Sequence, residues 1–458
     1  MNNIVVKNFS VKVSGIAGAL ADVQRYVKKD FLSDQALKLL AGSLSSDITL
    51  LRVEEPYVDK DFRDLFYRDF SKRFREVCRN SKRVHVYSDG DYLGFFTLHG
   101  VAPFNIGRSY LAPRAVGSRV HGYMCLSTYH VNFCGEDLTV NAFPWMQQDV
   151  NMSRCAHVAI WEVIRYFSQR RSNYSEVLLG EIDDAGDDFR RKVPSNGLTL
   201  TDIAACLCDH GFAVNIHSRE AIGKKIGTFD FNQLIFAYIE SGIPVVAVFS
   251  NRPHAVAVMG HGKVDVAAAA GYRDAVIPSY RLCGGLVSCD DNKMPYSELP
   301  TGVGEAAWKI SHIVAPLYEK MYVDLFTFMI DIVPEFEREF LDRSQGKQYI
   351  RRVFITSSNA FKRFVFRESG DEEYIKYTGR LLMPKFVVVA EYSLKDEFPG
   401  FIRYRLLFDA TSFERQSFKD NYICMKVQKK LMVNGIGHAL DLVRETEPVY
   451  VNNLIEEK

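Results

Sequence analysis

The stretch Cys155-Ala-His-Val-Ala-Ile-Trp-Glu-Val-Ile164 decides the expected fold, together with Pro253-His254-Ala-Val-Ala-Val-Met-Gly260 further on. The first stretch predicts a helix that is apolar on more than one side, and such a helix is buried inside a domain. The second predicts a buried strand that starts at a histidine. Thiol-dependent acyl chemistry needs this pair of residues, a cysteine as nucleophile and a histidine as its base.

Cys155 is expected in the first turn of its helix, with Asn151 or Ser153 as the N-terminal cap. Unpaired backbone N–H groups and the positive end of the helix dipole stabilise negative charge on a sulfur there. The alternative for Cys155 is a buried structural cysteine at a helix start. His254 follows a tight turn, so its ring can reach the sulfur as a general base, and the alternative is an ordinary sheet residue. His261, at the end of the same strand, is expected at the surface or in a supporting role.

Two acidic residues follow the short predicted strand Leu286–Cys289. A carboxylate at a strand end can accept a hydrogen bond from the far nitrogen of the histidine, and Asp290 is preferred over Asp291 because it is nearer the strand. An acidic turn without a catalytic role is the alternative. For the oxyanion, a side-chain amide upstream of the cysteine is needed, and Gln148 is preferred over Gln147, with solvated loop amides as the alternative.

The segment from Gln147 to Asp290 resembles the papain-like cysteine peptidases, and within them the peptidases that process bacteriocin leader peptides. The residues that carry the resemblance are the glutamine-then-cysteine helix, Asn196-Gly-Leu-Thr-Leu-Thr-Asp-Ile203, His210-Gly-Phe212, Ser241-Gly-Ile-Pro-Val-Val-Ala-Val248 and the strand after His254. The resemblance covers about a third of the chain. It implies a helix packed on an antiparallel sheet and a catalytic set of Cys155, His254, Asp290 and Gln148, with Asp291 as the alternative carboxylate.

The sequence departs from that family at three places. Ala156 stands where the family has glycine, the interval from glutamine to cysteine is one residue longer, and an insertion, residues 264–281, separates His254 from Asp290.

Length, charge and cysteine content indicate the general class of protein. The chain has 458 residues and a formal net charge of +1, which gives no electrostatic reason to expect nucleic acid as a partner. No apolar run approaches the roughly 20 residues that span a bilayer, and no secretory signal is visible, so no membrane partner is expected. The nine scattered cysteines are typical of a reduced, cytoplasmic compartment. No cofactor and no metal are expected, because Cys155 and His157, or Cys206 and Cys208, would point apart on a helix.

The predicted fold class is α+β, in three units. A papain-like cysteine peptidase domain at 121–320 is flanked by a mixed α/β domain at 1–120 and by an α+β region at 321–458. The expected function is a cytoplasmic cysteine peptidase or isopeptidase that acts on a peptide or protein, with the flanking units selecting substrate or contacting a protein partner. A deamidase or transglutaminase-like acyl transferase and a non-catalytic protein-binding module are the alternatives.

Overall fold

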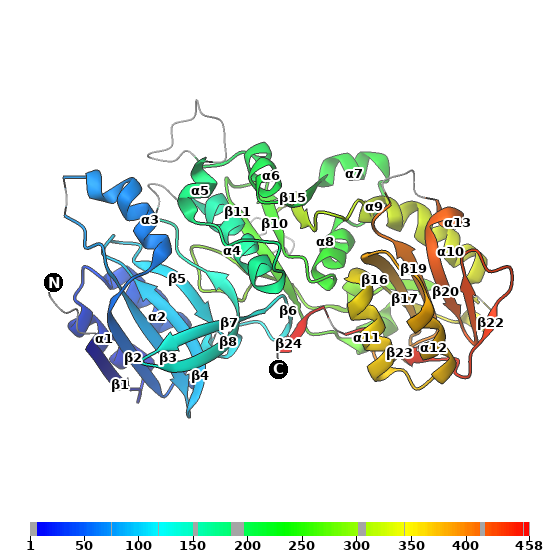
Figure 1. Ribbon diagram of the computed structural model, residues 1–458, viewed down its shortest axis with the longest axis horizontal. Helices are drawn as coiled ribbons and strands as arrows, with labels where there is room; N and C mark the ends of the chain where they lie inside the picture. The colour runs from blue at the N-terminus through cyan, green and yellow to red at the C-terminus, as the bar shows by residue number, and fades with distance from the viewer. Residues whose placement is uncertain are drawn as a thin grey trace.

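The computed structural model describes residues 7–74, 76–117, 119–149, 154–184, 197–300, 308–342, 344–412, 417–451 and 453–457. Three large β-sheets follow one another along its long axis, each with its own helices (Figure 1). Helices and largely antiparallel strands are segregated rather than alternating as βαβ units, so the predicted α+β class is confirmed.

The first sheet is antiparallel and contains, in spatial order, β1 (Lys7–Lys12), β2 (Leu50–Tyr57), β3 (Ser81–Ser88), β4 (Asp91–Leu98), β5 (Ile106–Leu111), β8 (Glu136–Trp145) and β7 (Ser127–Phe133). Its helices are α1 (Ile16–Val27), α2 (Asp34–Ser43) and α3 (Lys60–Arg68). Strands β3 and β4 form a hairpin that turns at residues 88–91.

The second sheet is also antiparallel and contains, in spatial order, β14 (Ser297–Glu298), β13 (Leu286–Cys289), β11 (Ala255–Gly262), β10 (Val245–Phe249), β15 (Ile310–Leu317) and β9 (Ala213–Ser218). Two further strands join it through β11, namely β6 (Gly122–Met124) and β24 (Ile455–Glu457). The helices of this part are α4 (Cys155–Arg170), α5 (Leu179–Asp184), α6 (Leu200–Asp209), α7 (Arg219–Lys225) and α8 (Phe231–Glu240).

Helix α4 is the central helix of the chain, because it packs on β10 and β11 of the second sheet and on β7 and β8 of the first. Every residue from Ala156 to Phe167 is buried, as the all-round apolar pattern predicts. Two of its side chains also bind α3: Trp161 Nε1 donates to Asp61 Oδ1 at 3.0 Å and Arg165 to the same oxygen at 2.6 Å. Helix α4 is therefore held between the first and second sheets and tied to α3.

The third sheet contains β12 (Val276–Pro278), β16 (Tyr349–Ser357), β17 (Phe386–Leu394), β19 (Tyr404–Asp409), β20 (Tyr422–Val427), β21 (Lys430–Val433) and β22 (Leu440–Asp441). Its β12–β16 pair is parallel and the other pairs are antiparallel. A small sheet pairs β18 (Phe401–Ile402) with β23 (Glu447–Pro448). The helices are α9 (Leu325–Thr327), a π-helical turn (Phe328–Ile332), α10 (Val333–Phe340), α11 (Ser358–Glu368), α12 (Glu372–Arg380) and α13 (Phe418–Asn421).

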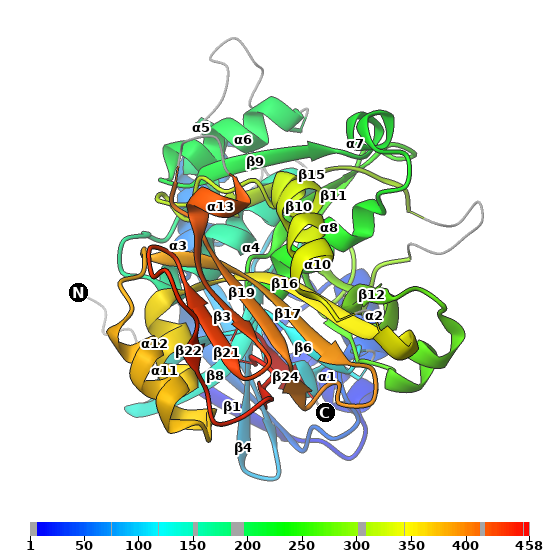
Figure 2. The same cartoon turned by 90° about the vertical axis from the view of Figure 1, so that its right-hand side faces the viewer.

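Helices cover both faces of the third sheet (Figure 2). Side chains alternate along β16, so Phe354 packs with Phe361 and Phe364 of α11, whereas Val353 and Ile355 face the main core. Helix α8 packs on that second face and also on β11, which joins the second and third sheets.

Several predicted limits differ from the structure. Helix α3 ends at Arg68, a short 3₁₀ turn follows, and Phe74 is fully exposed because it lies beyond the helix end. Strands β7 and β8 complete the first sheet although they follow residue 120, and β24 near the C-terminus pairs with β6 of the second sheet. The three predicted domain ranges stay predictions.

All nine cysteines have free thiols. Within the described ranges, no helix has both the length and the apolar character that crossing a membrane requires.

Candidate active site

Cys155 is the first residue of α4, as the sequence predicts, and its side chain is half-buried. Arg154 occupies the N-cap position, and its backbone N–H donates to His157 Nδ1 at 3.4 Å. The predicted caps, Asn151 and Ser153, lie outside the described residues. The sulfur therefore stands at the positive end of a buried helix, where a negative charge is stabilised.

His254 lies directly before β11, at the end of the turn that connects β10 to β11. Its ring packs edge-on against Trp308, with ring centroids 5.4 Å apart, and more distantly against Phe249. Trp308 in turn lies beneath the guanidinium of Arg252, 4.4 Å from the ring centroid. These aromatic contacts fix the plane of the imidazole next to the start of α4.

The structure brings Cys155, His254 and Asp290 together as one hydrogen-bonded series. His254 Nε2 lies 3.1 Å from Asp290 Oδ1, and the ring also hydrogen-bonds the Cys155 side chain. Because Nε2 faces the carboxylate, Nδ1 is the nitrogen that remains for the sulfur. Burial would lower the pKa of His254, but the bonds to Asp290 and Cys155 outweigh it and raise that pKa to about 10. The ring is therefore a cation at neutral pH.

The two aspartates have different environments. Asp290 Oδ1 also accepts from the backbone N–H of Asn292 at 3.0 Å, whereas Asp291 Oδ1 lies 3.8 Å from His254 Nε2. Although burial raises the pKa of Asp290, its bonds to His254 and Asn292 dominate and lower it. Burial and the neighbouring charge of Asp290 raise the pKa of Asp291 to about 7. Asp290, the aspartate nearer the strand end, is therefore the ionised partner of the imidazole.

The two glutamines, Gln147 and Gln148, also lie in different environments. The side chain of Gln147 is buried and its Oε1 accepts from the backbone N–H of Ile106 at 3.3 Å, so it belongs to the first sheet. The Nε2 group of Gln148 donates to Asn292 Oδ1 at 3.3 Å. Since Asn292 also binds Asp290, the amide of Gln148 lies on the same side of the site as the histidine and its carboxylate.

Glu162 is a buried acid beneath the site that sequence reasoning missed. It is 1% exposed, and neither carboxyl oxygen has a hydrogen-bond partner. Burial, followed by the charges of Asp291 and Asp290, raises its pKa well above the usual value, which favours the neutral acid. The sequence does contain a signal for this residue. Glu162 is the acidic residue of an apolar helix, and it lies seven residues after Cys155, on the same face.

Two other contributors were also missed. Asn292 follows the two aspartates in the chain, and its backbone and side-chain N–H groups donate to them. Trp308 lies more than fifty residues from His254 in the chain, and no local pattern connects them. The predicted surface position of His261 is wrong: this residue is 1% exposed, because β11 is covered by β6, β13 and α8.

In the described part of the chain, two groups have metal-ligating atoms within 4.8 Å of one another. One is His254, Asp290 and Asp291, whose atoms already form the hydrogen-bonded series. The other is Glu240, His261 and Cys283, at the opposite end of β11. No protein-family model, curated protein or solved structure matches this chain.

Proposed function

We propose that this protein is a cysteine-dependent acyl hydrolase, a peptidase or isopeptidase, with Cys155 as the nucleophile. The observation that carries the proposal is the series from the Cys155 thiol through the His254 imidazole to the Asp290 carboxylate. A sulfur at a helix N-terminus, beside an imidazole whose pKa is raised to about 10, has the position that a cysteine nucleophile requires.

In the first half of the reaction, the Cys155 thiolate attacks the carbonyl carbon of the scissile amide and forms a tetrahedral intermediate. The backbone N–H of Cys155 and the side-chain amide of Gln148 stabilise the negative oxygen. His254 then gives its proton to the leaving amine, the C–N bond breaks, and a thioester on Cys155 remains.

In the second half, His254 is neutral and takes a proton from a water molecule, and the resulting hydroxide attacks the thioester. The carboxylic acid leaves, and the thiolate and imidazolium are restored. Asp290 holds the ring in place and stabilises its positive charge in both halves, without itself accepting the proton.

A papain-like arrangement is the narrower form of this proposal. It is supported by the buried helix on an antiparallel sheet, and by the chain order of glutamine, cysteine, histidine and aspartate. We also propose a cytoplasmic location and a peptide or protein substrate, which the flanking units help to select.

The test is reaction of the full chain with a peptide mixture, followed by mass spectrometry of the products. Cleavage yields two shorter peptides, whereas a deamidase converts a side-chain amide to a carboxylate and leaves the chain whole. Cys155→Ala should abolish either reaction, and Cys208→Ala, an exposed thiol on α6, should leave it unchanged. Turnover that survives Cys155→Ala would show that another group is the nucleophile, and a lack of reaction in every variant would favour a binding module.

A further inference from the structure

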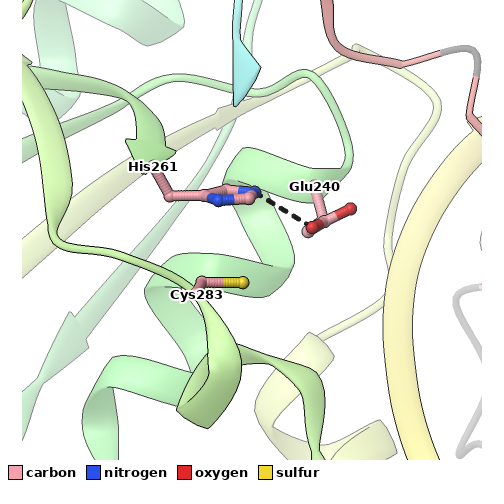
Figure 3. A group of neighbouring side chains, drawn as sticks. All are labelled: Glu240, His261 and Cys283. Atoms are coloured by element: carbon pink, nitrogen blue, oxygen red, sulfur yellow. Dashed lines mark hydrogen bonds and ion pairs between the residues drawn. The ribbon is translucent and has the colours of Figure 1, made fainter. Parts of the chain in front are cut away.

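A second cluster of ionisable side chains lies at the far end of β11 from His254. Figure 3 shows the side chains of Glu240, His261 and Cys283 converging from three elements. Glu240 ends α8, His261 lies near the end of β11, and Cys283 follows a 3₁₀ turn, Ser279–Leu282. One ligating atom from each lies within 4.8 Å of the other two.

The histidine is oriented so that one nitrogen faces the cluster. His261 Nδ1 lies 2.8 Å from the carbonyl oxygen of Gly262, so Nδ1 carries a hydrogen and donates it. Nε2 lies 3.1 Å from Glu240 Oε1. The lone pair of Nε2 and a carboxylate oxygen repel each other at this distance, so a positive species, either a proton or a metal ion, must lie between them.

We propose that Glu240, His261 and Cys283 bind a zinc ion. Nitrogen, oxygen and sulfur donors of these three types are the ligands that Zn²⁺ takes in proteins, and a histidine whose other nitrogen donates to a carbonyl is the usual orientation of such a ligand. Bonds of about 2.1 Å at a tetrahedral ion place an N and an O ligand about 3.4 Å apart, close to the 3.1 Å between Nε2 and Oε1.

The surrounding residues fix the carboxylate and leave room for a fourth ligand. Arg352 binds the other oxygen of Glu240 at 2.6 Å, which leaves Oε1 for the metal. A cavity of about 160 Å³ adjoins the cluster and is lined in part by Glu240, Cys283, Arg352 and Tyr123. That volume holds several water molecules. Three protein ligands and one position open to water are typical of a catalytic rather than a structural zinc site.

This site is independent of the proposed active site. His254 and His261 are seven residues apart on an extended strand, which separates them by about 23 Å. Failure of one proposal leaves the other standing, and the test must tell the two histidine clusters apart.

The experiment is titration of the full chain with Zn²⁺, after treatment with a chelator and its removal, by isothermal titration calorimetry. One ion per chain is expected. Cys283→Ala and His261→Asn should each weaken binding more than about 100-fold, since loss of even an outer partner of a ligand costs about 10–100-fold. Cys155→Ala, which alters the other histidine cluster, and Cys208→Ala should bind Zn²⁺ like the wild type.

Cobalt provides a readout that needs no variant. Co²⁺ bound to the wild-type chain should give a thiolate-to-cobalt charge-transfer band that Cys283→Ala abolishes, and circular dichroism of the metal-free variants checks their folding. Binding that Cys283→Ala leaves unchanged, or a cobalt complex without the thiolate band, would overturn the proposal. Loss of binding in Cys155→Ala alone would place the ion at the other cluster and equally overturn it.

Discussion

Replacement of one of two adjacent aspartates is expected to disable Cys155, whereas replacement of the other is not. Asp290 Oδ1 lies 3.1 Å from His254 Nε2 and the carboxyl pKa is lowered, so Asp290→Asn removes a charge that faces the imidazolium. Asp291 has a pKa of about 7, so at pH 6 it is mostly protonated. Asparagine is close in shape and charge to that protonated acid, which makes Asp291→Asn the matched control.

The size of the effect follows from the geometry. Two unit charges 3.1 Å apart attract each other by about 5 kcal/mol at an effective dielectric constant of about 20. Because solvent reaches the imidazole, we halve this to about 2.5 kcal/mol, which corresponds to a factor of about 70 in the population of the thiolate–imidazolium pair. A thiol with an ordinary pKa of about 8.5 is a thiolate in about one molecule in 300 at pH 6. The rate of alkylation at this pH therefore cannot fall by more than about 300-fold.

The assay is alkylation by iodoacetamide at pH 6, with the modified cysteines identified and timed by mass spectrometry. Asp290→Asn should slow alkylation of Cys155 by about 70-fold and Asp291→Asn by less than about threefold. The exposed thiol of Cys208 serves as a reference within the same molecule and should be unaffected. If both variants react like the wild type, or if Asp291→Asn is the slower one, the assignment of the ionised partner is wrong.

Three further outcomes are expected. Gln148→Ala should lower kcat by about 10²–10³ with little change in KM, since an oxyanion donor acts in the transition state, whereas Gln147→Ala should mainly lower the melting temperature. The pKa of His254, about 10, lies above the ordinary 6.5, so the stability that its protonated form contributes is complete below about pH 6.5 and is lost as the pH rises to about 10. In a pH–rate profile, the rate should fall on the alkaline side at about pH 10, and Asp290→Asn should shift the pH of that fall. Glu162→Leu should raise the free energy of unfolding, measured with denaturant, by about 1–3 kcal/mol, because it removes two buried oxygens without partners; an equal loss of stability would contradict this.

The helices and strands nearest the site could be predicted because local chemistry defines them. Helix α6 is followed by Gly211 and α8 by Gly242, and both glycines have positive φ angles, as a helix C-terminal signal requires. Strand β13 has the predicted limits, Leu286–Cys289. These elements bring Cys155, His254 and Asp290 to one place, as their order along the chain suggested.

What could not be predicted depends on contacts between distant segments. No local pattern assigns β7 and β8 to the first sheet, because a strand of alternating pattern pairs equally well with several edges. The same holds for β24, which crosses from the C-terminal region to pair with β6. Trp308 and Asn292 contribute through ring packing and amide geometry, and neither leaves a periodic signal.

The electrostatics of the candidate site also depends on burial rather than on the number of acids. Asp290, Asp291 and Glu162 together would place three negative charges beside one imidazole if all were ionised. Burial raises the pKa of Glu162 well above its usual value and, with the charge of Asp290, raises that of Asp291 to about 7, whereas the bonds of Asp290 to His254, Asn292 and Asp291 lower its own pKa. One negative carboxylate then faces one imidazolium, and the positive end of helix α4 lies on the other side of the ring, at Cys155. Below about pH 7 Asp291 is therefore protonated, whereas the ion pair of Asp290 with His254 remains.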